Sequence, residues 1–386
     1  MSLKPLFSRS LGADPTRLHF AAHSHHLWPD AAFEGHAQAA EDAARLADSK
    51  WDKVMAEVWP EAQAHVARDL GTGDPTAIVF SSNTHDFIVR LVTAAPRRSG
   101  RLRVLTSDGE FHSARRQLAR WEEEGWVGVE RIAADPFDSF ADRFLAAAKA
   151  GDHDLILLSQ VLFGSGRVFD RIEELAALGR TEGPWVVIDG YHAFMALPEP
   201  FGEAAAQSAF YLAGGYKYGM SGEGCVFMHA PADFGPRPPV TGWFAEYEDL
   251  ALPPGKVGYA TDARRFLGAT FDPSGLYRFN AVQRMLQANG LTTARISDHV
   301  AALQQLVLQA IGQTPLGAAE LLNPLDGRRH ARFLAFRSPH AQRWQQQLKA
   351  RNCITDVRGD VLRIGFGIYQ DSGDVERLAE MLPALS

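Results

Sequence analysis

Cysteine is scarce in this sequence, and long apolar runs are absent. Only two of the 386 residues are cysteines, Cys225 and Cys353. So few cysteines cannot build a disulfide framework, and their spacing fits no metal site, so we expect a reducing compartment, the cytoplasm. No apolar stretch reaches the ~18 residues that a transmembrane helix needs, and residues 1–6 lack the apolar core of a secretory signal. We therefore expect no membrane association.

An excess of basic residues is also missing. Lys and Arg together number 39 against 46 Asp and Glu, which gives a formal net charge of −7. A protein that binds nucleic acid whatever the nucleotide sequence needs a basic face, so we do not expect a nucleic-acid partner. The sequence has neither a Walker loop nor a Gly-x-Gly-x-x-Gly motif after a strand, so nothing supports nucleotide binding.

What the sequence does contain is an alternation of short apolar runs with helical stretches. A chain of this length exceeds what one hydrophobic core usually fills, so two domains are expected. Apolar strands that alternate with amphipathic segments, here roughly 112–124, 138–150 and 170–182, are typical of a buried, mostly parallel sheet covered by helices. The apolar runs are residues 77–80, 102–106, 155–159, 186–189, 209–213 and 225–228.

The two flanks of this region predict other structure. Residues 31–70 are rich in Ala and charged residues and predict a helix with a break at Pro60. The C-terminal third predicts a smaller α/β domain, with helices or strands near residues 276–312, 332–336, 341–350, 361–366 and 374–382. We therefore divide the chain into an N-terminal segment that packs with the small domain, a large domain and a small C-terminal domain, at residues 1–70, 71–275 and 276–386.

Polar residues follow two of the predicted strands, at the edge of the sheet where ligands bind in α/β folds. Ser81, Ser82, Asn83 and Thr84 come after the first strand and before a helix. Such residues are good N-caps, and the same helix end can bind a phosphate group. Asp189 ends another strand, where a buried acid needs a partner unless it caps a helix or reaches the surface.

One lysine stands in a glycine-rich segment after the next strand. Lys217 lies between Tyr216 and Tyr218, within residues 214–224, which contain five glycines. Glycine lets the backbone pass close to a bulky ligand, and a buried lysine becomes a nucleophile toward carbonyls. Taken alone, the segment could also be a flexible loop. An acid at one strand end and a lysine after the next strand are what pyridoxal 5'-phosphate (PLP) needs for its ring nitrogen and its Schiff base. Lys217 can then also move the proton at the substrate Cα.

Over residues 18–385 the sequence resembles the class V aminotransferase group of fold-type I PLP enzymes, and it is most similar to kynureninase. Asp189 and His192 resemble the family's Asp-x-x-His segment, Tyr216-Lys217-Tyr218 its Ser-Tyr-Lys-Tyr stretch, and Gly242-Trp243-Phe244 its Gly-Trp-Phe/Trp segment. The resemblance implies a large domain with a mostly parallel, seven-stranded-type sheet and a smaller α/β domain. It also implies that Asp189 binds the pyridine nitrogen, that His192 and Trp243 lie by the cofactor, and that Tyr216 reaches the phosphate.

Three further segments take their roles from this resemblance. Asn83-Thr84 is similar to the phosphate-binding loop, and the segment 110–113 to the one whose ring stacks on the pyridine, where Phe111 is favoured and His112 is the alternative. Thr270 corresponds to a threonine that reaches the phosphate of the partner subunit, which implies a homodimer with sites near its interface. Arg363 resembles the arginine that binds the carboxylate of an amino-acid substrate, a pairing that suits a planar guanidinium.

The sequence departs from kynureninases where the substrate's side chain is read. Residues 22–29 replace the family's Asn-Ser-x-Gly loop and include His23, His25 and His26. No carboxylate or cysteine stands nearby at ligand spacing, so we expect no metal. We interpret His25 and His26 as substrate-facing, with a purely structural loop as the alternative.

These departures leave the cofactor prediction intact and the reaction open. A class V aminotransferase-like activity is the first hypothesis, and hydrolysis of the Cβ–Cγ bond of kynurenine or a related amino acid is close behind. A cysteine desulfurase or lyase is a third, although Cys353 stands only ten positions before Arg363 (363 − 353), closer than in desulfurases. A PLP-fold protein that binds without turnover is the last.

Overall fold

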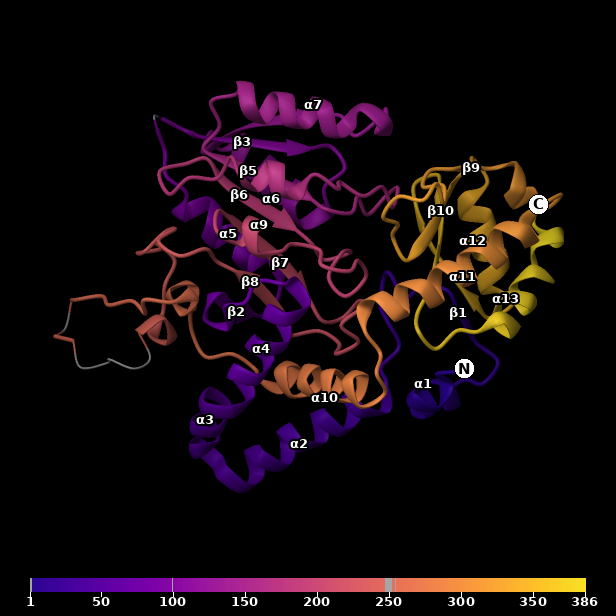
Figure 1. Cartoon of the computed structure of the whole chain (residues 1–386), viewed down its shortest axis with the longest axis horizontal. Helices are drawn as coiled ribbons and strands as arrows, with labels where there is room; N and C mark the ends of the chain where they lie inside the picture. The colour runs from indigo at the N-terminus through magenta and orange to yellow at the C-terminus, as the bar shows by residue number, and fades with distance from the viewer. Residues whose placement is uncertain (1, 99, 247–251, 254) are drawn as a thin grey trace.

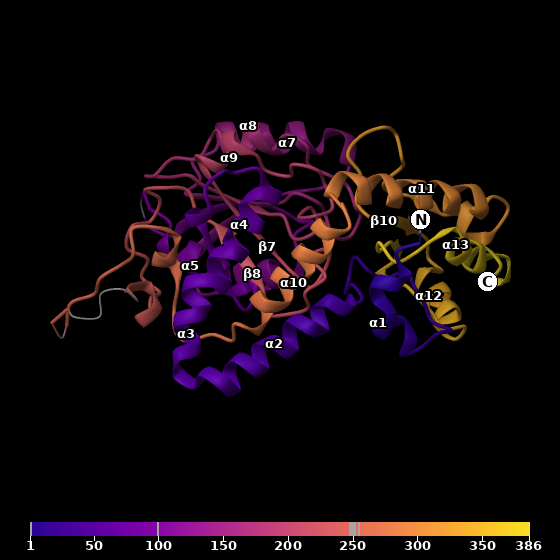
Figure 2. The same cartoon turned by 60° about the horizontal axis from the view of Figure 1, so that its bottom comes forward.

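The protein consists of a larger and a smaller α/β part that lie side by side. The computed structural model describes residues 2–98, 100–246, 252–253 and 255–386. The larger part is built on a seven-stranded sheet and the smaller on a four-stranded sheet (Figures 1 and 2). Among the described residues no helix is both long and apolar enough to cross a membrane.

The large sheet has the mostly parallel arrangement that the sequence predicts. Its strand order is β2-β8-β7-β6-β5-β3-β4, and β8 alone runs in the direction opposite to the other six strands. The predicted fold class, α/β with a mostly parallel seven-stranded sheet and a smaller α/β part, is therefore confirmed. The strands are β2 (Ile78–Ser81), β3 (Leu102–Ser107), β4 (Val127–Ile132), β5 (Leu155–Ser159), β6 (Trp185–Asp189), β7 (Ala209–Gly214) and β8 (Val226–His229).

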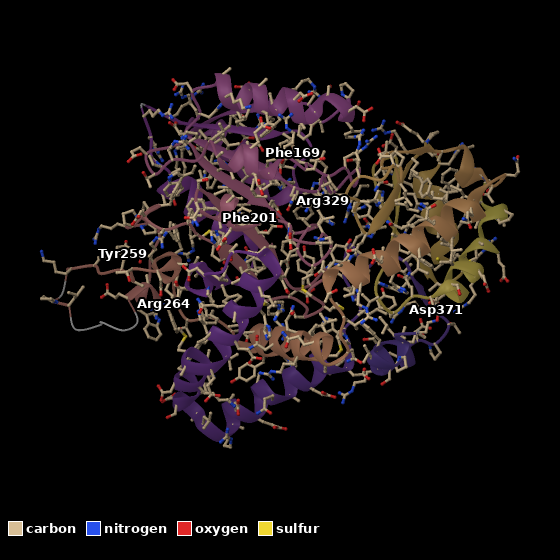
Figure 3. All side chains as sticks on the ribbon, viewed as in Figure 1. Phe169, Phe201, Tyr259, Arg264, Arg329 and Asp371 are labelled. Atoms are coloured by element: carbon tan, nitrogen blue, oxygen red, sulfur yellow. The ribbon has the colours of Figure 1, made fainter. Side chains whose placement is uncertain are left out.

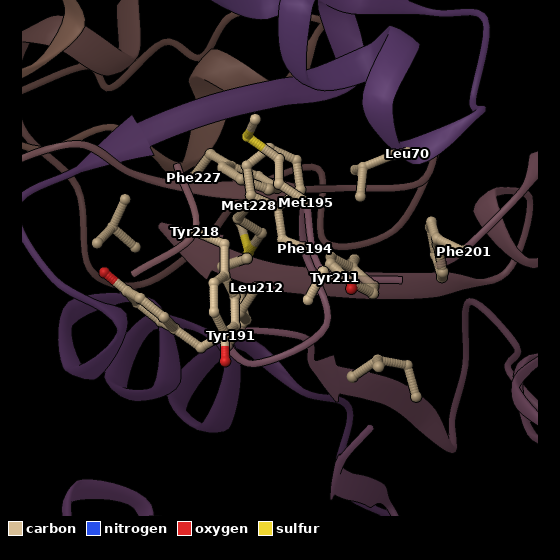
Figure 4. Close-up of a cluster of buried hydrophobic side chains, with 14 of the residues drawn as sticks. Leu70, Tyr191, Phe194, Met195, Phe201, Tyr211, Leu212, Tyr218, Phe227 and Met228 are labelled. Carbon is tan, nitrogen blue, oxygen red and sulfur yellow. The ribbon is translucent and has the colours of Figure 1, made fainter. Parts of the chain in front are cut away.

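Burial explains which strands the sequence shows clearly. Every residue of β5 and β7 is buried, as expected of strands covered on both faces. Edge strand β4 was not among the predicted strands, because only Val127 is buried in it and its charged residues interrupt the apolar run. Figure 4 shows part of the core, where Tyr191, Tyr211 and Tyr218 lie among phenylalanine and methionine side chains.

Helices of the predicted kind connect the strands. The side chain of Asn83 accepts a hydrogen bond from the N–H of Asp86 and caps the first helix after β2. The helix predicted at 170–182 is shorter, because the chain turns after Ala176 toward β6. The helices of this part are α5 (Thr84–Ala94), α6 (His112–Glu123), α7 (Phe137–Ala150), α8 (Ile172–Ala176) and α9 (Glu203–Ala206).

The predicted break at Pro60 is wrong in its position. The regular α-helix is interrupted earlier, between Ala47 and Val58. Pro60 lies in the first turn of the helix that follows. Proline is tolerated there because the first turn has no N–H bond to lose. That helix ends at Gly71, whose φ of 72° suits glycine. The helices are α2 (Asp30–Leu46), α3 (Lys50–Lys53), a π-helical turn (Val54–Val58) and α4 (Trp59–Leu70).

The smaller part is an antiparallel sheet with helices on it. Its strand order is β12-β13-β10-β9, and a two-stranded parallel pair, β1 with β11, adjoins it. The strands are β1 (Leu18–His19), β9 (Glu320–Leu321), β10 (Phe333–Arg337), β11 (Cys353–Ile354), β12 (Asp356–Arg358) and β13 (Val361–Gly365). The helices are α1 (Ser8–Gly12), α11 (Thr293–Ile311), α12 (Ala341–Lys349) and α13 (Ser372–Ala379).

The N-terminal segment contacts both parts. Leu18 and His19 pair with Cys353 and Ile354, whereas Gln63 of α4 donates a hydrogen bond to the carbonyl of Ile78 in the large sheet. Helix α10 (Ser274–Ala288) packs along α2 and α4. The domain boundaries at residues 70 and 275 stay a prediction.

A long connection joins β8 to α10, and its described residues form no strand. Figures 1 and 2 show it as an arm, and Figure 3 places Tyr259 and Arg264 on it, at the opposite end of the molecule from Asp371. Its described part contains two short 3-10 helices, η5 (Trp243–Glu246) and η6 (Ala263–Phe266).

Candidate active site

Lys217 lies in a buried pocket of aromatic rings just beyond the carboxyl end of β7. Its side chain is only 5% exposed. Its Nζ donates a hydrogen bond to the hydroxyl of Tyr216 at 3.1 Å and stands 4.5 Å from the centre of the Tyr191 ring. The loop that carries it closes through hydrogen bonds from Ser221 N to the carbonyl of Gly215 and from Gly215 N to that of Cys225. The amine is therefore held in place before any ligand arrives.

This environment changes the acidity of the amine. Burial lowers the pKa of Lys217 to about 7, the nearby Asp189 carboxylate opposes that fall, and Arg363 and Arg358 add to it. An amine with such a pKa is about half neutral at pH 7 and mostly neutral at pH 8, and the neutral form is the one that attacks a carbonyl carbon. The structure thus places a buried amine with a lowered pKa at the predicted position.

Asp189 ends β6, the strand next to the one that leads to Lys217. Its carboxylate accepts a hydrogen bond from the N–H of Tyr191 at 3.0 Å. Burial raises the pKa of Asp189, and the Tyr191 N–H and the Lys217 charge act against that rise. A carboxylate in this position gains stability from a cationic N–H donor.

The Phe111 ring faces the lysine, as the first of the two predicted alternatives requires. The centre of the Phe111 ring lies 5.6 Å from Lys217 Nζ, and Phe111 is the N-cap residue of α6. His112 is exposed, and its ring centre lies 5.1 Å from that of Phe163. These contacts favour Phe111 over His112 as the ring that stacks on a planar ligand.

The segment that resembles a phosphate-binding loop forms the start of α5. Asn83 caps this helix and Thr84 is its first residue. The hydroxyls of Ser81 and Ser82 both donate to the Asp86 carboxylate, each at 3.0 Å. The end of β2 therefore presents a capped helix N-terminus at the same sheet edge as Asp189 and Lys217, an arrangement that suits an anion.

Arg363 is buried beside the same pocket and already has partners. It lies in β13, and its guanidinium contacts the carboxylate of Asp356 and the carbonyl of Phe163. Burial would raise the pKa of Asp356, but the contacts with His23 and Arg363 outweigh burial and lower it. Arg363 is therefore a fixed cation next to Lys217.

Two buried histidines border this region. The Nδ1 atom of His192 has no hydrogen-bond partner in the described part of the chain, and burial lowers the pKa of His192 well below its usual value. His23 is fully buried and stacks on Phe333, and its Nε2 lies 3.7 Å from Asp356 Oδ2. Burial lowers the pKa of His23 to about 3, and the Arg363 charge lowers it further. Both rings are therefore neutral at pH 7.

The two histidines predicted to face the substrate have different surroundings. The His25 ring stacks on Tyr216, with centres 5.0 Å apart, so it borders the lysine pocket. His26 is buried against Phe7 and Tyr369, and its Nδ1 lies 2.7 Å from the carbonyl of Leu27. These contacts of His26 are those of a packed core residue.

Trp243 and Thr270 meet each other on the connection between β8 and α10. Trp243 Nε1 donates to Thr270 Oγ1 at 3.2 Å, and the tryptophan is 42% exposed. Thr270 also lines a cavity of about 360 Å³ with Ser81, Ser82 and Arg90. The segment around Thr270 therefore borders the β2–α5 loop of its own chain.

Three residues that lie in or next to the candidate site were not among the predicted site residues. Tyr191 and Glu110 stand in motifs that the sequence displays, but nothing in their spacing shows that they would be buried there. Asp356 has a clear signal: Gly359 and Asp360 form a two-residue turn between β12 and β13, which places Asp356 opposite Arg363.

Metal and thiol chemistry find little support in the described residues. Across residues 2–98, 100–246, 252–253 and 255–386, no group of three or more His, Cys, Asp or Glu side chains is placed to hold a metal ion. Cys225 and Cys353 are both buried, and burial raises the pKa of each thiol to about 12.

Two comparisons of the sequence match kynureninases over parts of the chain. Residues 296–382, which include Arg363, match the family model of the kynureninase C-terminal domain. The kynureninase of Geobacillus thermodenitrificans is 26% identical over 202 residues. That match spans 51% of this chain and 45% of the relative, less than half of its length.

Solved structures share the fold over nearly the whole chain. The cystine C-S lyase C-DES, in complex with its product cysteine persulfide, has a TM-score of 0.79 at 16% identity, covering 98% of this chain and 100% of that one. The cysteine desulfurase CsdA of Escherichia coli has a TM-score of 0.79 at 16% identity, with coverages of 99% and 97%. The cysteine desulfurase of Thermococcus onnurineus has a TM-score of 0.76 at 17% identity, covering 98% of this chain and 97% of that one. At these identities the likeness concerns the fold.

Proposed function

We propose that this chain is a PLP-dependent enzyme of the class V aminotransferase type that acts on an amino-acid substrate. The observation that carries the proposal is the surroundings of Lys217: a buried amine among aromatic rings, with a pKa lowered to about 7 and an acid at the neighbouring strand end. The shared fold and the matches with kynureninase support it.

The residues present fit the parts of this cofactor. Lys217 would condense with the aldehyde carbon and release water, and Asp189 would accept the hydrogen bond of the pyridine N–H. Phe111 would cover one face of the ring, with His192 beside it. The phosphate would lie at the start of α5, near Asn83, Thr84 and Tyr216. When bound, PLP supplies an electron-accepting ring that stabilises negative charge at the substrate Cα.

The chain's own groups would position the substrate and move its proton. Arg363 would pair with the α-carboxylate, which fixes Cα over the ring. Lys217, released when the substrate's amine replaces it, would be placed to take the Cα proton. His25, which stacks on Tyr216, is placed to border the substrate side chain.

Hydrolysis of a Cβ–Cγ bond is a second candidate, favoured by the two kynureninase matches. The kynureninase and transaminase hypotheses differ in one product, because hydrolysis of kynurenine releases anthranilate and transamination does not. Incubating the PLP-loaded enzyme with kynurenine and measuring anthranilate fluorescence would decide between them.

Two other hypotheses have less support. A desulfurase that uses a cysteine nucleophile needs an accessible thiol, whereas both cysteines are buried with raised pKa values. A lyase without such a thiol is tested by incubating the PLP-loaded enzyme with cystine and measuring its cleavage. A non-catalytic PLP-binding protein would not need the neutral amine and the paired arginine that stand together here.

We also propose a homodimer. Trp243 and Thr270 contact each other on the connection between β8 and α10, and the Trp243 side chain is 42% exposed, so a second copy could pack against this segment. In that arrangement Thr270 would complete the phosphate site of the partner subunit. Sedimentation that shows only monomer would contradict this part of the proposal.

The cofactor proposal itself is tested by reconstitution. Purified protein incubated with PLP is expected to develop a visible absorption band, and borohydride is expected to fix the cofactor on residue 217, seen by peptide mass spectrometry. The Lys217→Ala variant should give no adduct, whereas Lys149→Ala, which changes an exposed lysine, should label normally. Protein that stays colourless would overturn the proposal.

A further inference from the structure

A second buried carboxyl group lies at the same edge of the sheet as Asp189, hydrogen-bonded to the residue that pairs with it. Glu110 is 1% exposed and follows β3 in the short turn that leads to α6. Its Oε1 accepts a hydrogen bond from the Ser107 hydroxyl at 2.5 Å. Its Oε2 accepts from the N–H of Ser159 at 2.9 Å and from the Ser159 hydroxyl at 2.5 Å. Three donors therefore converge on one carboxylate inside the protein.

These donors place Glu110 in the layer of the predicted cofactor site. Ser107 is the last residue of β3 and Ser159 the last of β5. In the sheet Ser159 pairs directly with Asp189 on β6. Glu110 thus bridges two strand ends at the level of Asp189, and it immediately precedes Phe111, the ring that faces Lys217.

We propose that Glu110 is a positioning residue of the cofactor site, one that clamps the turn carrying Phe111 to β3 and β5 and places a second negative charge beside Asp189. This inference rests on the proposed function. The charge would act through Asp189, because negative charge next to that carboxylate favours a proton on the pyridine nitrogen and on the lysine-linked nitrogen. The hydrogen bonds would act through Phe111, by fixing the plane on which the ring stacks.

The surroundings of Glu110 make its charge adjustable. Burial raises the pKa of Glu110 to about 7, the bonds from Ser107 and Ser159 act against that rise, and Asp189 adds to it. Asp189 is the charged group that acts on it, because the β3 and β5 partners are serines. Of its titratable neighbours in the chain, Asp108 accepts a bond from Ala134 N and His112 packs on Phe163.

Two substitutions separate the two roles. Glu110→Gln keeps an acceptor for the Ser159 donors and removes the charge, whereas Glu110→Ala removes both. In PLP-loaded protein, the pH midpoint of the visible band should fall by about one unit in Glu110→Gln. Glu110→Ala should show the same fall and, in addition, weaker PLP binding and a reduced circular dichroism signal of the bound cofactor.

A matched control is Asp42→Asn. Asp42 is also 1% exposed and accepts bonds from Gln38, Arg45, Lys53 and Tyr277, but it lies on α2, outside the site. Its variant should lose stability and keep the midpoint of the band. If Glu110→Gln does not fold, Ser159→Ala should still shift the midpoint in the same direction by a smaller amount, since the loss of a donor makes Glu110 less anionic.

The outcomes separate this inference from the proposed function. Wild-type protein that binds no PLP would overturn both. Wild-type protein that binds PLP, with a midpoint in Glu110→Gln within about 0.2 unit of it, would overturn this inference alone. If the role of Glu110 is purely structural, Glu110→Gln would lower the unfolding temperature without moving the pH midpoint of the visible band. That result would also count against the inference.

Discussion

Asp356 and Arg363 stand directly opposite each other on the antiparallel strands β12 and β13, and their side chains form a buried ion pair. Asp356 also lies 3.5 Å from Arg358 and 3.7 Å from His23. This single carboxylate holds the arginine that we assign to the substrate, so it controls where an incoming carboxylate can bind.

Replacing Asp356 by Asn should destabilise the protein strongly. The change leaves the Arg363 charge, which is 2% exposed, without its counterion, and breaking a buried pair in this way costs about 3 kcal/mol. Urea unfolding of Asp356→Asn would show the loss. Asp138→Asn, which breaks an exposed pair with Arg167, should change little. Equal effects of the two variants would mean that the Asp356–Arg363 pair is not buried in solution.

Lys217 should contribute a rise in the stability of the cofactor-free protein between pH 7 and about pH 9, above which the two buried thiols contribute with the opposite sign. Lys217 has an ordinary pKa of 10.5 when unfolded and about 7 when folded. In that window the unfolded chain binds the extra proton, so unfolding becomes less favourable as the pH increases. Urea midpoints across this range would measure the rise. Lys217→Met should lack this contribution, and an identical slope in the variant would contradict the assignment.

Glu110 titrates in a lower pH range than Lys217, and its contribution to stability falls as the pH rises. Its pKa rises from 4.5 to about 7 on folding, so its contribution to stability is present below pH 4.5 and is lost as the pH rises to about 7. Urea midpoints between pH 4.5 and 7 should therefore fall less in Glu110→Gln than in the wild type. The Lys217 measurement above pH 7 stays separate from it.

Replacing Phe111 by Ala should weaken PLP binding about fivefold, because aromatic stacking contributes roughly 1 kcal/mol beyond burial. His112→Ala is the paired control, since His112 is exposed and packs on Phe163. Fluorescence titration of the cofactor-free variants would measure both affinities. A larger loss in His112→Ala would reverse the choice between the two rings.

Both thiols should be unreactive toward thiol reagents in the native protein. Cys225 and Cys353 are buried, and their raised pKa values leave almost no thiolate at pH 8. A thiol reagent such as dithionitrobenzoate should label neither residue until denaturant is added, and then both. The Cys225→Ser, Cys353→Ser double variant should retain turnover; loss of turnover with intact PLP binding would revive the desulfurase hypothesis.

The central sheet and the ends of its strands could be predicted from the sequence for a physical reason. Strands buried on both faces must be apolar throughout, so β5, β6 and β7 are visible as runs, and a polar residue after such a run lies at the ligand edge. Asp189 and Lys217 were located in this way.

What the sequence left hidden depends on contacts between distant segments. The edge strand β4 is half exposed and has no apolar run. Two of the three donors to the buried Glu110 come from Ser159, 49 positions later in the chain. His26 packs against Phe7 and Tyr369, and the sequence around His26 does not indicate either contact.

The pairing of β1 with β11 has a consequence for how the chain is made. The partners of Leu18 and His19, Cys353 and Ile354, are synthesised more than 330 residues after them (353 − 18 = 335). The segment around Leu18 therefore stays without its β partner until the segment around Cys353 has been synthesised. Contacts this remote in sequence also slow folding, because a very long loop must close before they form.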